Sequence, residues 1–312
     1  RRWDRVESLA RAGLRAGEPL GGAPVRAAVR AARAVLSDEL MPDFPAAMPG
    51  PAPAELPVTY RDGAAAVYMP ACLSRIFGRP RGHDDGPALP QALVDVSARA
   101  RLPVWIPPDV AGHCCGVPWS SKGYESGHVL MANRTVEALW RWSGEGELPI
   151  VIDASSCALG LSAEVAPALS DANRERHGSL EILDSISWAH DRLLPALEVT
   201  GKLGSVAIHP TCSVRHLGIA GKLEAIAAEI AEEVHLPLTA TCCGMAGDRG
   251  LLHPELTRSA TAEEAAELQG SSHDAYLSSN RTCELGMEQG TGRPYESFVL
   301  ALERATRPAQ PG

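Results

Sequence analysis

The sequence lacks the features that would place the chain in a membrane, outside the cell or on a nucleic acid. No apolar run approaches the roughly 18–20 residues that a membrane-spanning helix needs. The N-terminus lacks the basic-then-apolar layout of a secretory signal. The formal net charge of −9 argues against a nucleic-acid-binding surface. We therefore expect no transmembrane segment, no nucleic-acid partner and a cytoplasmic location, with a peripheral position at the inner face of the membrane as a second option.

Lysine is scarce as well, because only Lys122, Lys202 and Lys222 occur among the 29 basic residues. Together with the abundant alanine, glycine and proline, this composition indicates a GC-rich bacterial genome. The 312 residues are enough to bury one large core or two modest ones, so two domains are the first expectation.

Cysteine is too sparse for a disulfide-stapled scaffold, and a chain of this length does not need one. In a reducing compartment, cysteines are free thiols, metal ligands or redox centres. The eight cysteines are Cys72, Cys114, Cys115, Cys157, Cys212, Cys242, Cys243 and Cys283.

Every cysteine belongs to an internal repeat. Three motifs recur in the same order in the two halves: PxCxxRxxG at 70–78 and 210–218, CCG at 114–116 and 242–244, and Ser/Thr-Cys-x-Leu-Gly-Leu/Met at 156–161 and 282–287. Cysteines that only fill a core have no reason to repeat in this order. The repeat therefore favours two related sites over eight packing residues.

Strand-like and helix-like segments alternate from residue 61 onward. We expect strands at 65–69, 103–106, 149–152, 205–208, 234–238 and 275–277, helices between them that include 222–233, and a final helix at 295–304. This alternation predicts parallel sheets with crossover helices. The fold class is α/β, with two pseudo-symmetric modules, each a small parallel sheet flanked by helices, after an N-terminal helical linker. We expect a helical segment and Pro-rich linker at 1–60, a first module at 61–200 and a second at 201–312.

Each cysteine motif follows a predicted strand. Loops at the carboxyl ends of parallel strands lie side by side, so three loops in each half can bring four thiols together. Gly116 lets the backbone of the first CCG loop approach closely or adopt a positive φ. Four thiolates suit an iron–sulfur cluster of the 4Fe–4S type or a zinc ion. We predict all eight cysteines as metal ligands, with a cluster in one or both modules and zinc as the alternative in one of them.

Basic residues recur beside the cysteines. A cluster with four thiolates is negatively charged, and nearby cations offset that charge and tune its potential. We predict this cofactor-binding role for Arg75, Lys122, Arg215 and Arg249, against the alternative of arginines paired with carboxylates. The other polar candidates do not recur and are interpreted as ordinary loop residues: His113, His209, His216, His253, Asp153 and Asp248.

The doubled C…CCG…C arrangement resembles the cysteine-rich CCG domain. That domain occurs in the B subunit of heterodisulfide reductases, the iron–sulfur subunit of glycolate oxidase, lactate-utilisation proteins and the C-terminal part of FAD-linked D-lactate dehydrogenases. The resemblance covers roughly residues 61–312. The phrases at 113–123, 209–212, 242–250 and 279–283 look most like the last group.

The resemblance implies an electron-transfer module. In the long enzymes, an N-terminal FAD domain oxidises a 2-hydroxy acid such as D-lactate or glycolate, and a ferredoxin-like segment precedes the CCG pair. This chain has no CxxCxxCxxxCP run and no length for a flavin domain before Cys72. We therefore expect a C-terminal fragment that does not itself oxidise substrate. Its partners would be flavin and ferredoxin-like domains or subunits and a quinone or cytochrome-type acceptor.

One departure from the family concerns the last motif. In heterodisulfide reductases it is CxxC, whereas Gly160 and Gly286 stand at the final position here. Four thiols remain in each half, which puts the non-cubane cluster and disulfide-cleaving chemistry of those enzymes in doubt. Three hypotheses follow: an iron–sulfur electron-transfer module, a zinc-stabilised structural or docking module, and a disulfide reductase acting at the cluster. No convincing catalytic residue is apparent.

Overall fold

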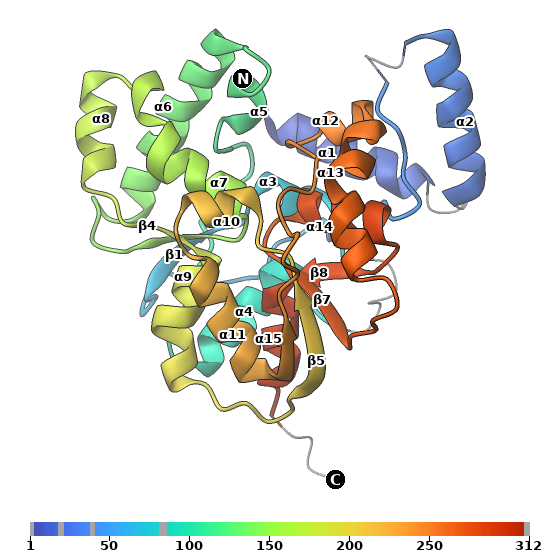
Figure 1. Cartoon of the computed structure of the whole chain (residues 1–312). Helices are drawn as coiled ribbons and strands as arrows, with labels where there is room; N and C mark the ends of the chain where they lie inside the picture. Colours follow the sequence, from blue (N-terminus) through green and yellow to red (C-terminus); the bar gives the residue numbers. More distant parts are fainter. Residues whose placement is uncertain (1–2, 18–21, 38–40, 81–85, 309–312) are drawn as a thin grey trace.

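The computed structural model describes residues 3–17, 22–37, 41–80 and 86–308 (Figure 1). Its strands form two separate sheets of four strands each, and every pairing is parallel. The strand orders are β2-β1-β3-β4 and β6-β5-β7-β8, which is the same order twice. The predicted α/β fold with two parallel-sheet modules is confirmed.

The first module alternates strands with helices. Its strands are β1 (Ala66–Met69), β2 (Val104–Trp105), β3 (Ile150–Ile152) and β4 (Ile182–Asp184). Its α-helices are α3 (Cys72–Ile76), α4 (Leu89–Arg99), α5 (Val117–Ser120), α6 (Glu125–Trp142), α7 (Ser155–Leu159), α8 (Asp171–Gly178) and α9 (Ser185–Trp188). The π-helices η1 (Gly160–Glu164) and η3 (Ala189–Leu193) continue α7 and α9, and the 3-10 helices η2 (Ala166–Ala168) and η4 (Leu194–Ala196) follow them.

The second module repeats this plan with fewer short helices. Its strands are β5 (Leu203–Ile208), β6 (Ala231–His235), β7 (Ala275–Ser278) and β8 (Tyr295–Ser297). Its helices are α10 (Cys212–His216), α11 (Ala220–Ile230), α12 (Arg249–Leu252), α13 (Pro254–Glu267), α14 (Arg281–Thr291) and α15 (Phe298–Ala305). Strand β1 and strand β3 are buried along their whole length, as expected for parallel strands covered on both faces.

The two modules pack with approximate two-fold symmetry. Helix α4 of the first module packs against α15 of the second, and α11 packs in turn against α9 and η3. In the same way α3 contacts α14, and α10 contacts α7. At the centre, the backbone N–H of Ser155 donates to the carbonyl oxygen of Ser279, and their hydroxyls are 2.8 Å apart. The carboxyl ends of β3 and β7 therefore meet, which brings the cysteine-bearing ends of the two modules together.

Two predictions of element boundaries were wrong. Helix α11 ends at Ile230, so residues 231–233, expected in the helix, belong to β6. Residues 295–297, expected to begin the last helix, form β8. In both places pairing with a neighbouring strand overrides local helix propensity, since Ser205 pairs with Glu233 and Tyr276 pairs with Tyr295.

The expected N-terminal helical segment is present as helices α1 and α2 and contacts both modules. Helix α1 (Trp3–Gly17) packs on α3, where Glu7 forms a buried ion pair with Arg75. Arg33 of α2 (Gly22–Val35) donates to the carbonyl oxygen of Leu252 at 2.8 Å, at the end of α12 in the second module. The segment thus contacts both modules, and the boundaries expected at residues 61 and 201 stay a prediction. None of the described helices is both long and apolar enough to cross a membrane.

Asp184 gives a testable pH dependence of stability. Burial raises its pKa to about 7, although one carboxylate oxygen accepts the Ile186 N–H at the start of α9. Because the folded pKa lies above the unfolded one, this carboxyl favours folding at low pH, and the benefit is lost as the pH rises from about 4 to about 7. Ser297, at the equivalent place in the second module, carries no charge.

We predict that Asp184→Asn removes this dependence. The asparagine side-chain oxygen can still accept the Ile186 N–H at the start of α9. The variant should therefore have the same free energy of unfolding as the wild type near pH 4 and a larger one near pH 8. The difference should grow by about 1.4 kcal/mol per pH unit within the window. Urea unfolding between pH 4 and 8 measures it, and parallel stability profiles for the two proteins would contradict the assignment.

Candidate metal centres

The first quartet consists of Cys72, Cys114, Cys115 and Cys157. The thiols come from the N-terminus of α3, the loop between β2 and α5, and α7, all at the carboxyl ends of strands. The sulfur atoms of Cys72 and Cys114 lie 3.9 Å apart, and those of Cys115 and Cys157 lie 3.2 Å apart. All four side chains are at most 5% exposed. The fold therefore brings the thiols of three distant loops into one buried cluster.

The second quartet consists of Cys212, Cys242, Cys243 and Cys283, from the equivalent places on α10, the β6–α12 loop and α14. The sulfur atoms of Cys243 and Cys283 lie 2.9 Å apart, and the Gly244 N–H donates to the Cys242 sulfur at 3.3 Å. Cys243 and Cys283 are buried, whereas Cys212 is exposed and Cys242 is partly exposed. The two quartets thus share a plan but differ in their access to solvent.

The CCG loops depend on a glycine at their third position. Gly116 has φ of 90° and Gly244 has φ of 69°, a region that side chains rarely adopt. A Cβ on Gly244 would also lie 2.6 Å from the Cα of Thr257. These turns let two adjacent cysteines face one centre.

A second glycine pair, Gly160 and Gly286, has little space around it. A Cβ on Gly160 would lie 2.6 Å from Cγ2 of Val117, and one on Gly286 would lie 2.6 Å from Cγ of Met245. The residue that follows each CCG therefore packs directly against the glycine of the last motif. Without repacking, each quartet has no room for a fifth thiol.

We predict that Gly286→Ala destabilises the chain by about 1–3 kcal/mol, the usual cost of overpacking a core. The matched control is Gly221→Ala in helix α11, where nothing lies within 4 Å of an added Cβ. The control should be neutral or slightly stabilising because alanine favours a helix. Equal free energies of unfolding for the two variants would contradict the close approach at Gly286.

Neighbouring thiols in each quartet shift one another's pKa. Hydrogen bonding with Cys114, followed by burial, raises the pKa of Cys72. In the second quartet, hydrogen bonding with Cys242 raises the pKa of Cys212, and hydrogen bonds with Cys212 and Cys243 lower that of Cys242. A metal binds thiolates, so loading either quartet releases protons.

Arg75 acts as a buried clamp beside the first quartet. It is 2% exposed, pairs with Glu7, and donates to the carbonyl oxygens of Pro70 at 2.5 Å and His113 at 2.7 Å. These carbonyls directly precede the loops of Cys72 and Cys114. The structure therefore gives Arg75 a carboxylate partner as well as a position near the thiols, and its role toward a cluster stays a prediction.

The other three basic candidates lie nearer the surface. Arg215 is exposed and donates to the carbonyl oxygen of Ala240, two residues before Cys242. The Lys122 ammonium pairs with Asp248 at 2.7 Å, across the two modules. Arg249 begins α12 and is exposed. Their contact with a cofactor also stays a prediction.

The sequence-based reasoning missed the residues that position and cover the first quartet. Glu7 is separated from Arg75 by 68 positions, and no motif links them. Asp153, interpreted from the sequence as an ordinary loop residue, accepts the Tyr68 hydroxyl at 2.5 Å and the Ala71 N–H at 2.7 Å, which anchors the residue before Cys72. The ring of Trp3 on α1 lies 4.7 Å from that of Trp119, centre to centre.

The histidines take structural partners. The ring of His113 contacts the carbonyl oxygen of Asp109 at 3.0 Å, and that of His209 contacts Glu264 at 2.8 Å. His253 lies 3.3 Å from Glu255. These contacts agree with the interpretation of these histidines as loop and core residues.

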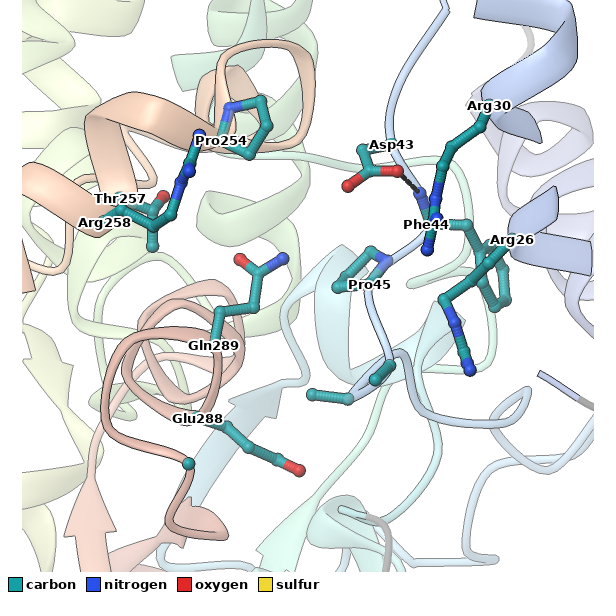
Figure 2. Close-up of a pocket in the computed structure, with 13 residues that line it drawn as sticks. Arg26, Arg30, Asp43, Phe44, Pro45, Pro254, Thr257, Arg258, Glu288 and Gln289 are labelled. Carbon is teal, nitrogen blue, oxygen red and sulfur yellow. Dashed lines mark hydrogen bonds between the residues drawn. The ribbon is translucent and has the colours of Figure 1, made fainter. Parts of the chain in front are cut away.

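The donor set fits a thiolate-bound cluster. Four thiols from three loops meet, and cysteine tetrads hold iron–sulfur clusters. Among the described residues, no group of three or more His, Cys, Asp or Glu side chains is already arranged around a single metal ion. A pocket of about 620 Å³ lies elsewhere, between α2, α13 and α14, and contains no cysteine among its lining residues (Figure 2).

Comparisons with known proteins find similarity to a cysteine-rich domain and to subunits of known enzymes. Residues 206–288 match the model of the CCG cysteine-rich domain. The glycolate oxidase iron-sulfur subunit of Escherichia coli K12 is 22% identical over 211 residues, which are 66% of this chain and 51% of that protein. The C subunit of the anaerobic glycerol-3-phosphate dehydrogenase of the same strain is 23% identical over 197 residues, 62% of this chain and 49% of that protein. The chain therefore spans about half the length of these relatives.

Proposed function

We propose that this chain, whose residues 206–288 match the model of the CCG cysteine-rich domain, is an iron–sulfur electron-transfer module of a flavin-linked dehydrogenase. The observation that carries the proposal is the doubled thiol quartet at the carboxyl ends of two parallel sheets. The name of one relative, an iron-sulfur subunit of an oxidase, supports the same class of cofactor. A pair of clusters would pass single electrons between a flavin and an acceptor.

The protein's own residues would bind and shield the clusters. The eight cysteines would supply the thiolates, and a cluster of the 4Fe–4S type would supply one-electron chemistry when bound. Arg75 would hold the two loops of the first quartet together, while α1 excludes water from it. The repeat extends the family assignment from residues 206–288 to the first module, which carries the same motifs in the same order.

The donor and the acceptor lie outside this chain in the proposal. The FAD would sit on a flavin domain or subunit, reached through a ferredoxin-like partner, and the acceptor would be a quinone or a cytochrome-type protein. The oxidised substrate would be a 2-hydroxy acid of the D-lactate or glycolate type. All eight cysteines are free, which supports a reducing cytoplasmic compartment, with peripheral attachment to the inner face of the membrane as an option.

Anaerobic spectroscopy tests the proposed function. The loaded chain should show broad visible absorption that bleaches with dithionite, together with a paramagnetic signal in the reduced state. A chain with its full metal complement and neither feature would contradict electron transfer by a cluster.

Zinc in the first quartet is the second candidate. Structural zinc sites are closed four-ligand sites, and the first quartet is buried throughout. Zinc there would leave a single redox centre, in the second quartet, and would halve the iron per chain. The third hypothesis, a disulfide reductase, loses support because Gly160 and Gly286 stand where the last motif of the heterodisulfide reductases has a further cysteine.

A further inference from the structure

The two quartets differ in how they are covered. In the first module, α1 lies over α3, and Glu7, Trp3 and Trp119 help to close the site. In the second module, the helix equivalent to α3 is α10, and the first thiol on it, Cys212, is exposed. An electron can therefore reach the second quartet from the surface over a shorter path than it can reach the first.

Basic side chains occur on the elements that carry or contact the second quartet. The basic rim consists of Lys122, Arg215 and Arg249. Arg215 and His216 are exposed on the same short helix as Cys212, and Arg215 also bonds to the loop that carries Cys242. Lys122 reaches the N-terminal end of α12 through Asp248, the residue before Arg249.

The rim contrasts with the rest of the chain. Formal net charge is −9, whereas the exposed rim side chains Lys122, Arg215 and Arg249 are basic. Lys122 pairs with the exposed Asp248. In the loop before Cys242, the exposed Leu238 donates its backbone N–H to the Glu267 carboxylate.

We propose that the open face of the second quartet docks a redox protein or domain through an acidic surface around that partner's own centre. This inference rests on the proposed function and deepens it, because it assigns the second quartet to exchange with an external partner and the first to internal transfer. Long-range attraction between the basic rim and an acidic partner would speed encounter. Salt would screen this attraction beyond a Debye length, which is about 8 Å at physiological ionic strength.

Charged thiol reagents test the surface on the cluster-free chain. In each reaction a cysteine thiolate attacks a methanethiosulfonate, a mixed disulfide forms, methanesulfinate leaves, and the thiol proton passes to solvent. An anionic reagent (2-sulfonatoethyl) and a cationic one (2-trimethylammonioethyl) are compared by peptide mass spectrometry, and rates are divided by those of the urea-unfolded chain. The normalised labelling rate of Cys212 with the anionic reagent should be about two to ten times that with the cationic reagent at low salt. The two rates should become nearly equal at 0.5 M salt.

Two variants sharpen the test. Neutralising part of the rim in Arg249→Gln should reduce the ratio at least twofold. Arg30→Gln, which removes an exposed arginine on α2 beside the pocket of Figure 2, should leave it unchanged. Arg215 and Lys122 are left unchanged because each also holds the structure together. Arg215 donates to a loop carbonyl oxygen, and Lys122 pairs with Asp248.

An acidic probe protein tests docking directly. A plant-type 2Fe–2S ferredoxin should protect Cys212 from labelling at low salt, whereas a basic cytochrome c should not. A ratio below one, labelling of the first quartet as fast as Cys212, or no protection by ferredoxin would overturn the proposal. If the anaerobically purified chain held no iron, the proposed function would be refuted. The docking proposal would still be tested separately, because the labelling experiment needs no cluster.

Discussion

Cys243→Ser is expected to remove the iron of the second quartet and to leave that of the first, so that iron per chain falls by about half. Cys243 is 3% exposed, and its sulfur lies 2.9 Å from that of Cys283. Serine is a poor ligand for iron in a thiolate site, and the second quartet holds no further thiol to replace the lost ligand.

The repeat supplies the matched control. Cys115→Ser changes the equivalent buried thiol of the first quartet, 3.2 Å from Cys157, and should remove the other half of the iron. The double variant should bind none. If either single variant kept all its iron, or if each lost all of it while remaining folded, the two-site account would be wrong.

Arg75→Met is expected to lower the free energy of unfolding by about 3–5 kcal/mol, the usual cost of removing one partner from a buried ion pair. The change leaves the Glu7 carboxylate, 1% exposed, without its charge partner, and leaves the carbonyl oxygens of Pro70 and His113 without this donor. The double variant Glu7→Leu/Arg75→Met should recover part of the loss, because it removes the uncompensated charge.

Arg215→Met is the matched control, since Arg215 holds the equivalent place in the second PxCxxRxxG motif. Arg215 is exposed and bonds to one carbonyl oxygen, so its loss should cost about 1 kcal/mol or less. Chemical denaturation under reducing conditions measures both variants. A cost for Arg75→Met no larger than that for Arg215→Met would contradict the clamp.

The sequence predicted the fold class and the internal repeat because both depend on local patterns. Alternating apolar segments identify parallel strands, and motifs at strand ends predict that their loops converge. The structure does bring Cys72 and Cys114 into contact from loops 42 positions apart. Where tertiary pairing opposed local propensity, at 231–233 and 295–297, the prediction was wrong.

The difference between the quartets was beyond the reach of sequence patterns. The motifs around Cys72 and Cys212 are nearly the same, so they predict the same exposure. The difference in coverage depends on helix α1, whose Glu7 meets Arg75 only after the chain has folded back on the first module. Helices α1 and α2 confirm the helical segment expected at the N-terminus. Its packing against both modules was not predicted, because proline spacing reports local conformation and not the surface on which a segment packs.

Iron, zinc and acid-labile sulfide per chain, measured together on anaerobically purified protein, test the central claim most directly. The account predicts about eight iron and eight sulfide for two 4Fe–4S clusters, or about half of each with one zinc ion if the first quartet holds zinc. Zinc without iron, or no metal with all eight thiols free to react, would contradict it.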